Sequence, residues 1–172
     1  YQLTEEEQDI VEKLHHSFVG SEKLRTHMHC LFRYGCMYNV CNSNLLFHAS
    51  MPLNPDGTLK EVTILGKQYK GKALLDKVGH LIRIAYFSEE NTEKARFARD
   101  YIWYLWCGKN SPAFDKSKMA TFERYFLDDK ELHKETKGHY YTLRDNEQVC
   151  EMILDEFGVA GEHRHIINGH VP

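Results

Sequence analysis

The period of the hydrophobic pattern changes several times along this sequence, and these changes constrain its fold more than any other feature. Apolar residues recur at helical spacing over residues 5–34. Short apolar runs around turn residues then occupy 36–49 and 62–69, a pattern typical of two β-hairpins. Helical spacing returns over about 72–157, and a last short strand is expected at 166–168. The pattern therefore predicts a mixed α and β fold.

Capping signals divide the first helical stretch into two helices. Thr4 and Glu7 have the spacing of a capping box, which predicts a helix that begins at about residue 5. Gly20 ends that helix, and Ser21 can cap a second one that Gly35 closes. Further along, the sequence predicts a helix from residue 72, a helix capped by Asn91 and Thr92, a short helix at 122–127, a loop or exposed helix at 128–138 and a helix at 146–157.

Length and composition exclude several classes of protein. The 172 residues are 42% hydrophobic and carry a net charge of -3, which suits one ordinary domain. No basic stripe favours nucleic acid as a partner, and no apolar run approaches the roughly 20 residues of a membrane-spanning helix. The five cysteines contain no C-x-x-C pair, which predicts reduced thiols and a cytoplasmic location.

Both ends of the sequence are abrupt. Tyr1 is not an initiator methionine, and the chain stops at Pro172, directly after a Gly169-His170 pair that is typical of an active site. We therefore expect residues 1–172 to form a single but partial domain of a longer protein. The expected sheet would be completed by residues outside this chain.

Two histidines stand apart from the other nine. His48 and His170 each follow a short apolar strand and have small neighbours, so a cation can approach them closely. Neutral imidazole is a good ligand for manganese, iron and zinc, and two strand ends brought together could supply two ligands. The alternative is that each histidine is partly buried and hydrogen-bonded to a carbonyl group, and spacing alone favours this alternative.

A basic, hydroxyl-bearing segment is the second candidate site. Lys109 follows Gly108, and Arg124 lies a short way downstream. Guanidinium and ammonium groups suit phosphate, and glycine allows backbone amides to approach an anion. The segment can equally be an ordinary solvated loop, since no Walker-type phosphate loop is present. No G-x-S-x-G elbow supports nucleophilic catalysis, and the aromatic run 101–106 is more typical of core packing than of base stacking.

Five segments of the sequence resemble the class III fructose-1,6-bisphosphatases of Firmicutes and Bacteroidetes. They follow the same order as in that family and extend over nearly the whole chain. Among them, the run WYLWCGKNSP is far more specific than any short motif. The segments are residues 44–53, 69–76, 103–112, 121–126 and 165–172.

This resemblance implies a branch of the calcineurin-like metallophosphoesterases. It implies part of a β-sandwich with a large helical insertion at about 72–158. Proteins of that kind bind two divalent metal ions through D-x-H, GDxxDR and GNH[DE] motifs and two later histidines. The later histidines match His48 and His170, which reverses the preference stated above from spacing alone. The earlier motifs are absent from this sequence and would lie upstream of Tyr1, so we expect this chain alone to be inactive.

The reaction that the resemblance implies is hydrolysis of fructose 1,6-bisphosphate to fructose 6-phosphate and phosphate, in gluconeogenesis, by direct attack of water on phosphorus. Manganese is the expected cofactor, and Lys109 and Arg124 are our own candidates for sugar-phosphate contacts. No catalytic residue is assigned within the chain. Two other functions stay open: a related phosphoesterase acting on a nucleotide or phosphoprotein, and a non-catalytic regulatory or assembly module. The helical insertion can be an oligomer interface, so a homo-oligomer is possible.

Overall fold

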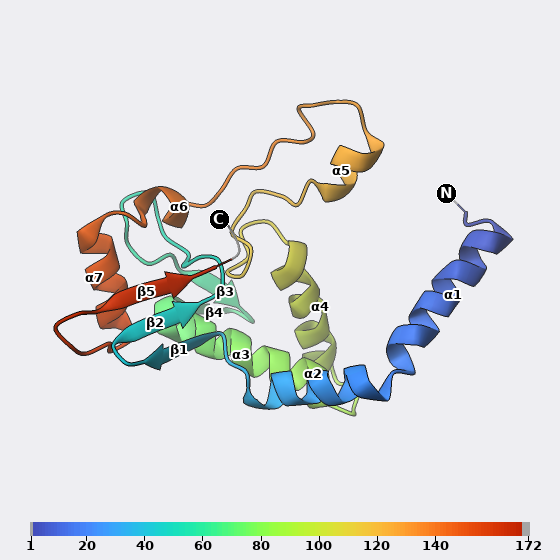
Figure 1. Cartoon of the computed structure of the whole chain (residues 1–172), viewed down its shortest axis with the longest axis horizontal. Helices are drawn as coiled ribbons and strands as arrows, with labels where there is room; N and C mark the ends of the chain where they lie inside the picture. Colours follow the sequence, from blue (N-terminus) through green and yellow to red (C-terminus); the bar gives the residue numbers. More distant parts are fainter. Residues whose placement is uncertain (1, 170–172) are drawn as a thin grey trace. The chain divides into compact units, whose positions relative to one another are not determined.

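The structure is a computed structural model that describes residues 2–169, and it divides into two units, Tyr1–Gly35 and Cys36–Pro172 (Figure 1). The first unit consists of helices α1 (Glu5–Val19) and α2 (Glu22–Tyr34). The predicted capping box is present at the start of α1, where Glu7 N–H donates to Thr4 Oγ1 and Thr4 N–H donates to the Glu7 carboxylate. Neither helix contains a buried residue.

A three-stranded sheet organises the second unit. Strands β1 (Tyr38–Cys41) and β2 (Asn44–Phe47) form the predicted hairpin, and β5 (His165–Asn168) pairs with β2 in parallel. The Cα register places Phe47 beside Asn168, so β2 and β5 end at the same edge of the sheet. The second predicted hairpin, β3 (Val62–Ile64) with β4 (Lys67–Tyr69), forms a separate two-stranded sheet. The mixed α and β class predicted from the sequence is therefore what the structure shows.

Among its described residues, the second unit contains five helices. Thr92 caps α4 through Ala95 N–H, as predicted, whereas Asn146, expected as the first residue of its helix, is the cap of α7 and accepts from Val149 N–H. The four-residue helix α6 has no capping signal and was not predicted. No described helix is both long enough and apolar enough to cross a membrane. The helices are α3 (Gly71–Phe87), α4 (Glu93–Cys107), α5 (Thr121–Phe126), α6 (Tyr140–Leu143) and α7 (Glu147–Glu156).

Two hydrophobic clusters hold this unit together. In the first, Leu45 and Phe47 from β2 pack with Tyr140 of α6 and Ile153 of α7. In the second, one face of α3 packs on one face of α4, as the helical spacing predicts. The core role expected of the aromatic run holds for Tyr101 but is wrong for its two tryptophans, which are exposed because the helical period turns them away from α3.

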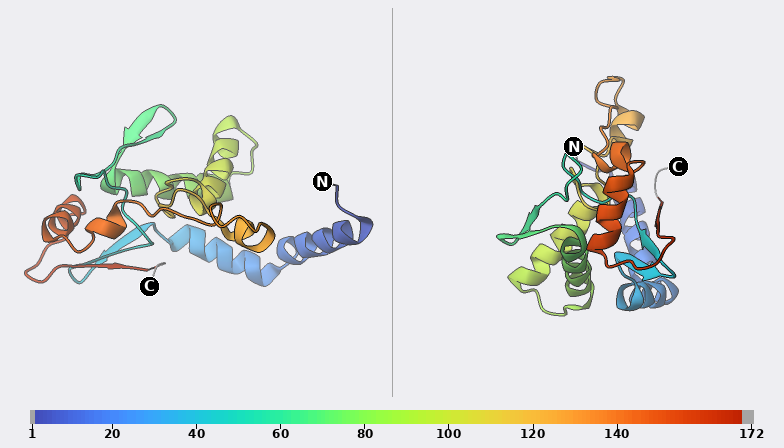
Figure 2. Two further views of the ribbon diagram at one scale, coloured as in Figure 1. Left: turned by 90° about the horizontal axis from the view of Figure 1, so that it is seen from above. Right: turned by 90° about the vertical axis from the view of Figure 1, so that its left-hand side faces the viewer.

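Residues 116–137 form an arm that carries α5 and projects away from α3 and α4, as Figure 1 and the right-hand view of Figure 2 show. An antiparallel bridge between Lys116 and Lys137 closes its base. Glu135 fixes the inside of the arm: its carboxylate accepts hydrogen bonds from Ala120 N–H at 2.9 Å and Lys116 Nζ at 3.0 Å, and it lies 3.5 Å from the Arg124 guanidinium. Of the two alternatives predicted for 128–138, a loop or an exposed helix, the structure shows the loop, and Glu135 anchors it.

The α3–α4 cluster predicts a large difference between two leucine deletions. Leu81 is completely buried, whereas the side chain of Leu132 is 40% exposed. Leu81→Ala should lower the free energy of unfolding by about 3 kcal/mol, because it removes buried methyl groups and leaves a cavity. Leu132→Ala should cost less than about 1 kcal/mol. Urea unfolding of the two variants checks this, and equal losses would contradict the assigned core.

The anchor of the arm predicts a pH-dependent contribution to stability. Burial raises the pKa of Glu135, but the Ala120 amide and the Lys116 ammonium outweigh this effect and hold the pKa below its ordinary value. The stabilisation is therefore complete above the ordinary glutamate pKa of about 4.3 and is lost as the pH falls through the lowered pKa.

Glu135→Gln should accordingly destabilise the chain by about 2 kcal/mol at pH 7, the typical value for a hydrogen bond to a charged group. At a second, acidic pH below the lowered pKa of Glu135, the difference from wild type should be small, since the wild-type carboxylate is then largely protonated. Urea unfolding at both pH values measures the two differences. A loss that is the same at both would show that the charge of Glu135 does not stabilise the arm.

Candidate functional site

His48 lies directly after β2, at the start of a sharp corner that we call the His48 corner, residues 48–50. Ala49 has a φ of 58°, in the left-handed region that non-glycine residues seldom adopt, and Ser50 N–H donates to His48 O at 2.8 Å. The imidazole is on an exposed residue, whereas Ala49 and Ser50 are buried. The predicted strand end therefore presents a histidine from a buried backbone turn.

Two hydrogen bonds from distant parts of the chain hold this corner. Ser50 Oγ donates to Asp115 Oδ2 at 2.5 Å, and these residues are only 1% and 6% exposed. Asn168 Nδ2, at the end of β5, donates to Ala49 O at 2.8 Å, and Tyr140 OH donates to Asn168 Oδ1 at 3.2 Å. The ends of β2 and β5, the loop after α4 and helix α6 thus meet at the corner.

Asp115 is itself held tightly. Its N–H donates to Ser111 O at 2.7 Å, and the buried Ser111 hydroxyl donates to Leu105 O at 2.8 Å. Its carboxylate lies so close to Gly138 that a side chain there would collide with it. Burial raises the pKa of Asp115 above its usual value, against the opposing effects of the Ser50 hydroxyl and nearby positive charge. The loop 108–115 is therefore a rigid support for this carboxylate.

His170, the other predicted metal ligand, lies outside the described residues, so its role stays a prediction. What the structure shows is that β2 and β5, the strands that precede the two histidines, are parallel neighbours. Within residues 2–169 no group of three or more histidine, cysteine, aspartate or glutamate side chains is placed to hold a metal ion. The imidazole of His48 can supply one ligand to a divalent metal ion, but a complete site needs further ligands from elsewhere.

The two residues predicted to contact substrate lie in different segments. Lys109 is exposed in the loop 108–115, the same loop that ends in Asp115. Arg124 lies in α5, where its guanidinium pairs with Glu135 and donates to His133 O at 3.3 Å. A role in binding phosphate stays a prediction for both.

Three residues of the site were missed in the sequence. Ser50 and Asn168 each stand two residues from a histidine already singled out, and their position beside a strand end is a signal that could have found them. Asp115 has no local signal, because only the tertiary structure brings it to Ser50, which lies 65 residues away in the sequence.

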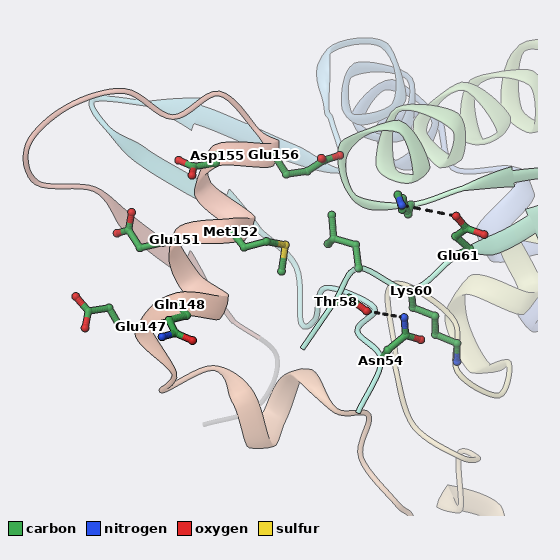
Figure 3. A pocket seen from close by; sticks show the side chains of 12 residues that line it. Asn54, Thr58, Lys60, Glu61, Glu147, Gln148, Glu151, Met152, Asp155 and Glu156 are labelled. Carbon is green, nitrogen blue, oxygen red and sulfur yellow. Dashed lines mark hydrogen bonds and ion pairs between the residues drawn. The ribbon is translucent and has the colours of Figure 1, made fainter. Parts of the chain in front are cut away.

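A groove of about 1370 Å³ lies between the loop 54–61 and α7 (Figure 3). Its α7 wall is acidic, with Glu147, Glu151, Asp155 and Glu156 on the helix. Several of these carboxylates are already engaged: Asp155 and Glu151 pair with Arg164, and Glu156 accepts a hydrogen bond from a backbone amide. Because like charges repel, this groove does not suit a phosphate group.

Comparison with known proteins supports one family. The family model described as Firmicute fructose-1,6-bisphosphatase matches residues 1–172. Curated relatives named fructose-1,6-bisphosphatase class 3 match 100% of this chain, with 74% identity in Phocaeicola vulgatus, 67% in Bacteroides fragilis and 54% in Clostridium botulinum.

The matched region is 26% of the length of each of these relatives, so the chain spans about a quarter of them. No solved structure matches the chain significantly. The family model nevertheless covers the sequence from end to end. The chain belongs to the Firmicute fructose-1,6-bisphosphatase family.

Proposed function

We propose that the longer protein containing this chain hydrolyses fructose 1,6-bisphosphate to fructose 6-phosphate and phosphate, in gluconeogenesis. The observation that carries this proposal is the match of all 172 residues to the family, with up to 74% identity to the curated relatives cited above. A water-soluble sugar bisphosphate is the substrate, and the cytoplasm is the proposed location.

The chain supplies part of a metal site in a calcineurin-like metallophosphoesterase fold. His48 and His170 are the proposed ligands, at the ends of neighbouring strands, and manganese is the proposed ion. When bound, two divalent ions lower the pKa of water and neutralise the charge of the reacting phosphate. The His48 corner contributes a fixed imidazole to that site. Because one described imidazole cannot hold such ions alone, the isolated chain should be inactive.

Substrate contacts are proposed for two cationic side chains. Lys109 is exposed, and it shares the rigid loop 108–115 with Asp115, so its charge can lie near the His48 corner. Arg124 offers a planar fork that suits phosphate, although part of that fork already faces Glu135. Of the two, Lys109 has the greater freedom to bind an anion.

The direct test measures phosphate release from fructose 1,6-bisphosphate by the full-length protein with manganese. His48→Ala should reduce kcat by at least about a hundredfold, because it removes a metal ligand from the reacting centre. His16→Ala is the matched control: it removes an exposed histidine from α1, in the other unit, and should leave the rate unchanged.

Two results would contradict different parts of this proposal. No phosphate release from this substrate by the wild-type protein would refute the reaction, and a panel of nucleotides and phosphopeptides would then identify another phosphate ester. Wild-type release that persists in a folded His48→Ala protein would leave the reaction standing and refute the metal role of His48.

An assembly role is the second candidate, and the tip of the arm favours it. Tyr125 and Phe126 are 80% and 77% exposed, and Phe126 stacks on the exposed Phe122. Large exposed apolar patches commonly mark contacts between proteins. For this assembly role, we propose that the arm joins two copies of the longer protein.

A double substitution, Tyr125→Ser with Phe126→Ser, should then lower the sedimentation coefficient of the full-length protein from that of an oligomer to that of a monomer. Phe87→Ser, at an exposed aromatic residue of α3 outside the arm, is the control and should change nothing. An oligomer that survives the double substitution would exclude the arm as its interface.

A further inference from the structure

The backbone at the His48 corner cannot be maintained by local interactions alone. Ala49 adopts a φ of 58°, and a residue with a Cβ atom prefers other conformations. Such a conformation persists only where surrounding contacts over-determine it. Here the two neighbouring polar groups, Ala49 O and the Ser50 hydroxyl, each have a partner from a remote segment.

We propose that Asp115 and Asn168 are positioning residues that hold the imidazole of His48 in the orientation in which it binds metal. This inference rests on the proposed role of His48 as a ligand. Neither residue is proposed to touch the metal or the substrate. Both act through the corner, Asp115 on the Ser50 side chain and Asn168 on the Ala49 carbonyl.

The geometry of the Ser50–Asp115 pair supports this role. A hydroxyl donating to a carboxylate at 2.5 Å is at the short end of charge-assisted hydrogen bonds. Both groups are almost fully buried, so water cannot replace the bond when it is broken. Ser50 N–H in turn binds His48 O, so the position of Ser50 fixes the backbone from which the imidazole projects.

Asn168 gives independent support from the other strand. Its amide donates to Ala49 O at 2.8 Å, while Tyr140 OH donates to its Oδ1 at 3.2 Å, which fixes the orientation of the amide. Asn168 also stands beside Phe47 in the parallel register, one residue before the corner begins. The corner is therefore fixed to the end of the strand that leads toward His170.

Outer residues of this kind orient a ligand and tune its affinity for metal. Their loss typically weakens metal binding by about ten- to a hundredfold. A purely structural residue would instead lower stability and leave metal affinity unchanged in the protein that remains folded. These two consequences can be measured separately, which makes the proposal testable.

The experiment uses the full-length protein and measures the dissociation constant of Mn²⁺ by titration calorimetry, with the thermal midpoint measured in parallel. Ser50→Ala and Asp115→Ala should each weaken Mn²⁺ binding by about ten- to a hundredfold. The double variant should be no weaker than the more affected single variant, since the two groups share one hydrogen bond. Asp115→Asn keeps an acceptor for the Ser50 hydroxyl and should recover most of the affinity.

Thr92→Ala, which removes a helix cap far from the corner in sequence, is the control variant. It should lower the thermal midpoint and leave Mn²⁺ affinity unchanged.

Two results would overturn the inference. If Ser50→Ala binds Mn²⁺ within about twofold of wild type while His48→Ala loses binding, the positioning role of Asp115 is wrong and the ligand role of His48 stands. Ser50→Ala alone decides this if Asp115→Ala fails to fold. If His48→Ala also keeps its affinity, the ligand role and the positioning role fall together.

Discussion

The parallel pairing of β2 with β5 is the interaction on which the second unit depends. Parallel neighbours cannot be joined by a tight turn and need a long crossover connection. Here that connection contains the β3–β4 hairpin, helices α3 to α7 and the arm. The pairing brings Phe47 beside Asn168, and so places the His48 corner next to the end of a strand more than a hundred residues later in the chain. Without the β2–β5 pairing, Asn168 would not lie beside the His48 corner.

Local chemistry in the sequence predicted most of the elements. The predicted capping residues Thr4, Ser21 and Thr92 each bond the backbone amide that their position implies. What local chemistry could not predict is pairing at long range, because neither register nor neighbour is encoded in the period of one strand. The short helix α6 was missed for a related reason: it is stabilised by Tyr140 in the core rather than by a cap.

The candidate site, like the fold, could be predicted from the sequence only in part. His48 was proposed as a ligand because a histidine after an apolar strand is visible in the sequence, and Lys109 was proposed as a substrate contact because it lies in a glycine-containing basic loop. The groups that hold the corner were not found, since Asp115 depends on the path of the loop after α4 and Asn168 on the β2–β5 register. The tryptophans of α4 show the opposite error, in which aromatic content suggested burial but the helical period faces them outward.

The most direct test of the account is where manganese binds in the full-length protein. A crystal grown with Mn²⁺ and measured near the manganese absorption edge would locate the ion by anomalous scattering. We predict an anomalous peak within bonding distance of a ring nitrogen of His48, with Ser50 still bonded to Asp115. A manganese ion bound wholly by other residues, with His48 away from it, would contradict the account.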